Sequence, residues 1–106
     1  MMSRGPKRPH MREDQFQEKI LELCKWLRLR TYHTYDSRRS NAGFPDLVIV
    51  GKHGAVFAEL KSTSGKVSLA QQEWYDELIM AGQQAYIWRP EDWPQVEKVL
   101  KQIAGG

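Results

Sequence analysis

The feature that most constrains the fold is a pair of short apolar segments separated by a tight polar turn. The first is DLVIV (46–50), the second is AVFAELK (55–61), and GKHG (51–54) lies between them. Both have the length of a strand and are rich in β-branched and aromatic side chains. A turn centred near residue 53 therefore predicts an antiparallel β-hairpin. A chain of 106 residues has room for one core built around that hairpin.

The segment before the hairpin predicts a helix and then a strand. From Glu13 onward, apolar residues recur at helical spacing, namely Phe16, Ile20, Leu23 and Leu27. Cys24 lies beside this stripe, and we expect it to fill the core. TYHTY (31–35) is β-branched and aromatic and predicts a strand, whereas DSRRSNAG (36–43) predicts a loop.

The segment after the hairpin predicts two more helices and one more strand. STSGK (62–66) is a loop, and the capping-box spacing of Ser68 and Gln71 opens a helix to about Met80, with Trp74 and Leu78 on its apolar side. Residues 84–88 predict a strand, and Asp92-Trp-Pro begins a helix to about residue 103. The order is α-β-β-β-α-β-α. A helix between two strands favours a parallel crossover, so we expect an α/β fold with a mixed sheet flanked by helices.

The charge distribution favours a polyanionic partner. The net charge is +3, but residues 1–12 carry +4 and residues 25–66 carry +5, while 13–24 and 67–106 each carry −3. Clustered positive charge suits nucleic acid, although a solvated tail and an ordinary surface would look the same. Residues 1–12 lack apolar periodicity and are expected to form a flexible basic arm, leaving 13–106 as a single domain.

Composition favours an intracellular, cytoplasmic protein. No apolar run reaches the roughly 18 residues that a membrane span needs, and the basic N-terminus lacks the apolar region of a secretory signal. The single cysteine, Cys24, excludes an internal disulfide and a thiolate zinc cluster within the chain. We therefore expect no contact with a membrane.

Charged residues of the hairpin predict a reaction centre. Because side chains alternate along a strand, Glu59 and Lys61 share one face, and the other face is apolar. The hairpin returns Asp46 to the end of that strand. Two converging carboxylates repel unless a cation such as Mg²⁺ binds them, and a nearby lysine stabilises developing charge, as phosphodiester hydrolysis requires. The alternative is an exposed Glu59–Lys61 pair of negligible energy, with Asp46 serving only the turn.

Taken together, these motifs resemble a known family. GFPD (43–46), a hairpin, ELK (59–61) and GKVSLAQ (65–71) follow one another as in the PD-(D/E)xK nuclease superfamily. More narrowly, the chain resembles the VRR-NUC domain in the stand-alone form found in phages and bacteria, over roughly residues 13–90. The resemblance implies a restriction-endonuclease-like core and an endonuclease that uses Mg²⁺ or Mn²⁺ to cut DNA, commonly branched DNA.

The resemblance also implies roles for individual residues. Asp46, Glu59 and the main-chain carbonyl of Leu60 match the metal ligands, and Lys61 matches the catalytic lysine. The family supplies a further glutamate from the first helix, where Glu13, Glu18 and Glu22 are all available. The string EDQFQ (13–17) favours Glu13, with Glu18 as the alternative. Acids at a helix N-terminus also favour the helix itself, which is the other explanation of Glu13.

Other residues around the motifs have two possible roles each. Gln71 matches a family glutamine that helps to hold the attacking water or the lysine, although the capping box with Ser68 would use the same side chain. His33 contacts the phosphate or is a structural hydrogen-bond donor, and we do not expect it to bind metal. Cationic and polar residues of two loops are expected to contact DNA phosphates, the alternative being solvated loops; these are Ser37, Arg38, Arg39 and Lys66.

The size of the domain favours recognition of DNA shape. So small a surface cannot read a long sequence, which favours structure-selective, Holliday-junction-resolvase-like cutting. Two symmetric cuts in a four-way junction favour a homodimer, and Trp88 and Trp93 are either interface or core residues. The alternatives are a non-catalytic nucleic-acid-binding module on a nuclease fold, or a nuclease acting on RNA or non-branched DNA.

Overall fold

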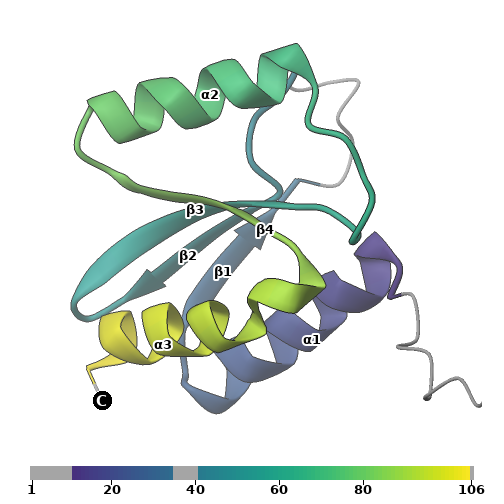
Figure 1. Cartoon of the computed structure of the whole chain (residues 1–106). Coiled ribbons are helices and arrows are strands. Elements are labelled where there is room, and N and C mark those ends of the chain that lie inside the picture. The colour runs from purple at the N-terminus through teal and green to yellow at the C-terminus, as the bar shows by residue number, and fades with distance from the viewer. Residues whose placement is uncertain (1–10, 35–40, 106) are drawn as a thin grey trace, which may run out of the picture.

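The elements follow the predicted order. The computed structural model describes residues 11–34 and 41–105 (Figure 1). Its elements are α1 (Glu13–Trp26), β1 (Arg30–His33), β2 (Leu47–Gly51), β3 (Gly54–Leu60), α2 (Leu69–Met80), β4 (Gln84–Trp88), the 3-10 turn η1 (Pro90–Asp92) and α3 (Trp93–Ala104). The α-β-β-β-α-β-α order is confirmed, and among the described residues the structure adds the short turn η1 before the last helix.

The four strands form one mixed sheet in the order β1-β2-β3-β4. The pairs β1–β2 and β2–β3 are antiparallel, whereas β3 and β4 are parallel and α2 connects them. In the hairpin Leu47 pairs with Ala58, so the preceding residue, Asp46, lies opposite Glu59. This register brings the two predicted carboxylates to the same end of neighbouring strands.

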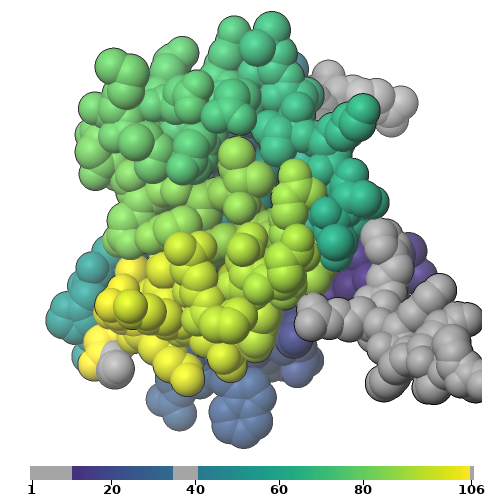
Figure 2. Space-filling view, in the orientation of Figure 1, coloured from purple at the N-terminus to yellow at the C-terminus, as the bar shows by residue number. Residues whose placement is uncertain are grey.

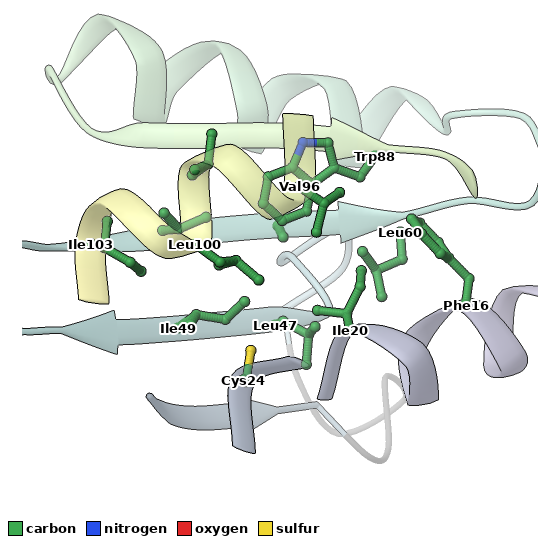
Figure 3. Close-up of a cluster of buried hydrophobic side chains, with 13 residues drawn as sticks. Phe16, Ile20, Cys24, Leu47, Ile49, Leu60, Trp88, Val96, Leu100 and Ile103 are labelled. Atoms are coloured by element: carbon green, nitrogen blue, oxygen red, sulfur yellow. The ribbon is translucent and has the colours of Figure 1, made fainter. Parts of the chain in front are cut away.

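The helices cover the two faces of the sheet. Helices α1 and α3 lie on one face and α2 lies on the other (Figure 1). The core fills the space between the sheet and the α1–α3 layer (Figure 3). Within α1 the buried stripe is Phe16, Ile20 and Cys24, so Cys24 is a core residue as expected. Leu23 and Leu27 are only partly buried, because the sheet meets the helix along the i, i+4, i+8 line.

Helix α2 packs more loosely than the other two helices. None of its residues is buried, and Trp74 and Leu78, its predicted apolar side, are half-buried. The ring of Trp74 meets that of Phe44 edge-on, with centroids 5.0 Å apart. In Figure 2 the surface of α2 stands apart from that of α3 beside β4. A groove along this edge is lined by residues that include Tyr75, Ile79 and Gln95.

Trp88 and Trp93, for which both an interface and a core role were open, lie in the core or against it. Trp88 is completely buried and its indole donates to Gln95 Oε1 at 2.9 Å, so of its two open roles the core role is confirmed. Trp93 packs against the core, and its ring centroid lies 4.2 Å from Lys19 Nζ.

Among helices within the described ranges, none is long and apolar enough to cross a membrane. Residues 1–10 of the predicted basic arm (1–12) lie outside the described ranges.

Candidate active site at the end of the β2–β3 hairpin

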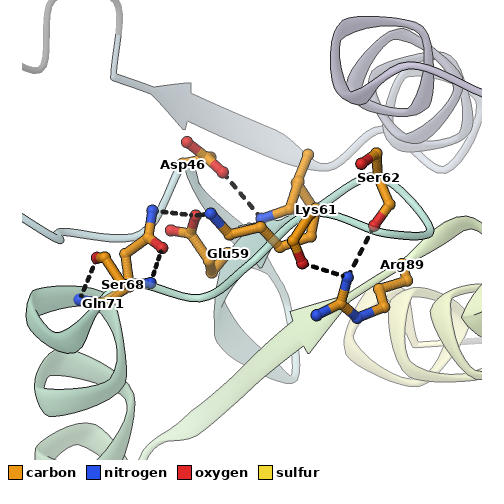
Figure 4. A network of polar contacts seen from close by, with 9 residues as sticks. Asp46, Glu59, Lys61, Ser62, Ser68, Gln71 and Arg89 are labelled. Atoms are coloured by element: carbon orange, nitrogen blue, oxygen red, sulfur yellow. Dashed lines mark hydrogen bonds and ion pairs between the residues drawn. The ribbon is translucent and has the colours of Figure 1, made fainter.

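A turn packed against α2 delivers Asp46 to the sheet. Gly43 adopts a φ of +84°, and a Cβ on it would lie 2.4 Å from the main-chain carbon of Ala70. Only glycine fits so close to the first turn of α2. Beyond the turn, Asp46 Oδ2 accepts a hydrogen bond from Leu60 N at 2.8 Å (Figure 4). The Asp46 side chain thus reaches across the hairpin to the end of β3.

Glu59 and Lys61 form a buried pair beside Asp46. Glu59 is 4% exposed and is the one buried polar or charged residue in the described part of the chain. Lys61 Nζ lies 3.8 Å from Glu59 Oε2, and only 11% of the lysine side chain is exposed. The alternative of an exposed Glu59–Lys61 pair is therefore wrong, because α2 and the loop before it cover this end of the sheet (Figure 4).

Burial disfavours the charged forms of the Asp46 and Glu59 carboxyls. It raises the pKa of Glu59 to about 8, and the negative charge of Asp46 adds to the shift while Lys61 opposes it. Burial also raises the pKa of Asp46, against the opposing effects of the Leu60 N–H and of a hydrogen bond with the Glu59 carboxyl. In addition, Glu59 Oε1 is buried without any hydrogen-bond partner. An unpaired buried carboxylate oxygen beside a second carboxylate suits an oxygen-seeking cation.

Glu13 interacts electrostatically with this pair. Partial shielding from water raises the pKa of Glu13, and the negative charge of Asp46 raises it further. The positive charge of Lys61 opposes this shift. Glu13, Glu18 and Glu22 are all exposed on α1, so exposure does not separate them. Within residues 11–34 and 41–105, no three His, Cys, Asp or Glu side chains are grouped closely enough to hold a metal ion. Glu13 as a third ligand therefore stays a prediction.

Gln71 has the capping role and in addition contacts the buried carboxylate of Glu59. Its side-chain oxygen accepts from Ser68 N at 2.9 Å, and its backbone N–H donates to Ser68 Oγ, completing a capping box. At the same time Gln71 Nε2 donates to Glu59 Oε2 at 2.8 Å (Figure 4). The amide thus contacts the buried carboxylate, while a contact with the attacking water or with Lys61 stays a prediction.

The remaining predicted residues lie around the site or outside the described ranges. A positive charge on His33 lowers the pKa of Asp46, which places the imidazole near that carboxylate. Lys66 is exposed in the loop between β3 and α2. The predicted DNA contacts Ser37, Arg38 and Arg39 lie outside the residues that the structure describes.

Comparison with known proteins identifies the family. The model of the VRR-NUC domain matches residues 2–91 of this chain, which include the hairpin and all of the motif residues. The chain belongs to the VRR-NUC family. A solved structure of a VRR_NUC domain protein resembles this VRR-NUC domain with a TM-score of 0.67 at 22% identity, over 90% of this chain and 89% of the other. No curated protein matches the chain.

The match confirms the predicted family, and the solved structure confirms the fold. VRR-NUC is a nuclease family, so the general assignment of the chain as a nuclease is confirmed. The match ends before α3, although Val96, Leu100 and Ile103 of that helix belong to the core.

Arg89 is a residue near the site that sequence reasoning missed. Its guanidinium contacts the loop that follows Lys61, more than twenty residues earlier in the chain. No local pattern marks such a residue, because WRPE (88–91) reads as a strand end followed by a turn.

Proposed function

We propose that this VRR-NUC domain is a divalent-metal-dependent endonuclease that hydrolyses DNA phosphodiester bonds and selects branched DNA. The observation that carries the proposal is the buried carboxylate of Glu59. One of its oxygens has no partner, and the other receives Gln71 and lies 3.8 Å from Lys61 Nζ. A buried carboxylate beside Asp46 destabilises the folded state. Its presence therefore supports a functional role for Glu59.

The donor set fits Mg²⁺ or Mn²⁺. Asp46, Glu59 and the main-chain carbonyl of Leu60 would hold the cation, with Glu13 as the proposed further ligand. All are oxygen donors, which hard divalent cations prefer. When bound, the cation neutralises the two carboxylates, acidifies a water and withdraws charge from the scissile phosphate.

Side chains of the domain supply the remaining functions. Lys61 keeps its ammonium beside the carboxylates, where it can donate to a phosphate oxygen as negative charge develops. Gln71 fixes the rotamer of Glu59 through its hydrogen bond to Oε2, so that Oε1 stays available for the cation. Lys66 and the loop residues Ser37, Arg38 and Arg39 are proposed to contact phosphates on either side of the cut.

Selectivity for branched DNA is proposed together with a homodimer. A four-way junction has two equivalent strands to cut, and a two-fold dimer presents two equivalent sites. Exposed apolar side chains on the sheet face opposite the core support such an assembly. Tyr32 is 62% exposed there and Val50 is 43% exposed.

A cleavage panel tests the proposal. Four-way junctions, flaps, plain duplex, single strands and RNA of matched sequence are each incubated with the protein in Mg²⁺, in Mn²⁺ or in excess chelator. We expect paired symmetric nicks in four-way junctions, with either metal, and no product in chelator. Cutting of RNA or of plain duplex at equal rates would overturn the selectivity, and tight DNA binding without any cleavage would favour a non-catalytic module.

A further inference from the structure

Arg89 binds the loop at residues 62–66, which follows Lys61. It stands directly after β4, and its Nη1 donates to the carbonyls of Ser62 at 2.8 Å and Gly65 at 2.7 Å (Figure 4). A third carbonyl, that of Thr63, lies 3.4 Å from the same nitrogen. Three carbonyl dipoles that converge on one point repel each other unless a cation lies between them. The fold of this loop therefore depends on the guanidinium.

The arginine is itself anchored to the fold. Its backbone N–H donates to Asp92 Oδ2 at 2.8 Å, in the turn η1 that leads into α3. One residue earlier, the carbonyl of Trp88 accepts from Lys61 N at 2.9 Å, and Trp88 is fully buried. The guanidinium therefore projects from a backbone that the core fixes.

The loop lies against the side chain of Lys61. A Cβ on Gly65 would lie 3.5 Å from Lys61 Cδ and 3.1 Å from Ser62 Oγ, so Gly65 lies beside the aliphatic part of the lysine. Lys61 is thereby shielded from water and its ammonium is directed to Glu59 Oε2 at 3.8 Å. If the Gly65 carbonyl lost its partner, the loop could move away and the lysine would gain rotamer freedom.

We infer that Arg89 is a positioning residue for the nuclease reaction, which sets the position of Lys61 through the carbonyls of Ser62 and Gly65. This inference rests on the proposed function. We expect Arg89 to act on the rate of the chemical step rather than on DNA binding, because its guanidinium is engaged by main-chain carbonyls of the loop beside Lys61. A displacement of about 1 Å at a catalytic group can lower a rate by roughly a hundredfold.

Single-turnover kinetics on a four-way junction in Mg²⁺ test the inference. We compare the wild type with Arg89→Ala, Arg89→Lys and the control Lys98→Ala, which removes an exposed cation of α3. For Arg89→Ala we expect the cleavage rate constant to fall about tenfold or more, with DNA affinity changed less than about threefold. Arg89→Lys should keep an intermediate rate, because an ammonium can satisfy some of the carbonyls.

Two further readouts separate positioning from general loss of structure. Guanidinium ion at millimolar concentration should restore part of the Arg89→Ala rate, and it should leave Lys98→Ala unchanged. Amide hydrogen exchange of the DNA-free protein should speed up over residues 62–66 and stay unchanged in the core strand β3. If Arg89→Ala does not fold, Arg89→Lys and its exchange pattern carry the same test.

The possible failures are distinguishable. A wild type that cuts no DNA contradicts the proposed function, whatever Arg89 does. A wild type that cuts while folded Arg89→Ala cuts at the same rate, or loses activity solely through weaker DNA binding, overturns the role of Arg89.

Discussion

At the scale of single residues, Glu59 is the most informative side chain of the domain. Its buried carboxylate has a pKa raised to about 8, so the folded protein holds a proton that the unfolded chain releases near its ordinary pKa of 4.5. Between these two pH values the folded state binds more protons than the unfolded state. The metal-free protein should therefore lose stability as pH rises from about 4.5 to about 8.

Thermal unfolding in chelator at a series of pH values measures this dependence. Glu59→Gln should flatten the fall across that window, because the amide does not titrate, whereas the exposed Glu73→Gln should follow the wild type. Added Mg²⁺ or Mn²⁺ should stabilise the wild type more at the upper end of the window, where the proton no longer competes with the cation. Parallel curves for wild type and Glu59→Gln would contradict the assignment.

At the scale of elements, the start of α2 joins helix capping to the active site. Ser68→Ala removes the hydroxyl that accepts from Gln71 N and should cost about 1 kcal/mol of unfolding free energy, with cleavage unchanged. Gln71→Ala should cost a similar amount and in addition slow cleavage about tenfold or more, because Glu59 loses its amide partner. Urea unfolding and single-turnover cleavage measure the two effects. Equal activity in both variants would leave Gln71 a capping residue only.

The contact between the GFPD turn and α2 gives a second test at this scale. Gly43 and Gly82 have nearly the same positive φ, +84° and +82°, but a Cβ on Gly82 meets nothing within 4 Å. Gly82→Ala should therefore show the backbone cost alone, about 1 kcal/mol. Gly43→Ala should cost about 3 kcal/mol or more, since its Cβ would overlap the Ala70–Gln71 backbone.

Urea unfolding of both variants measures the difference. A common cost for the two glycines would mean that the close approach at Gly43 relaxes without penalty. A larger cost at Gly43 supports packing of this turn on α2 as the means by which Asp46 and Gln71 are brought to the same site.

At the scale of the whole molecule, we expect two copies of the domain to associate. Sedimentation velocity over a concentration series should show a reversible monomer–dimer equilibrium. Tyr32→Lys should shift it toward monomer, because it places a charge on the exposed sheet face. Glu91→Lys, an exposed change in η1, is the control. A monomer at every concentration, with and without a four-way junction, would contradict the dimer.

Local sequence patterns predicted most of this architecture, because its helices and strands follow from the spacing of apolar residues over short stretches. Periodicity marked α1 and the hairpin, and residue alternation placed Glu59 and Lys61 together on the face away from the core. Features that arise only from packing were not predictable. Nothing near residue 89 shows that its guanidinium meets carbonyls 24 to 27 positions away, and nothing in α1 distinguishes Glu13 from Glu18 by spacing alone.

We propose above that Asp46, Glu59 and Lys61 form a metal-dependent reaction centre. Single-turnover cleavage of a four-way junction in Mg²⁺ or Mn²⁺ tests it most directly, with wild type, Asp46→Asn, Glu59→Gln and Lys61→Ala compared after circular dichroism has verified folding. We expect each substitution to lower the rate constant at least about a hundredfold and excess chelator to abolish wild-type cleavage. Wild-type activity in any one folded variant, or undiminished cleavage in chelator, would contradict it.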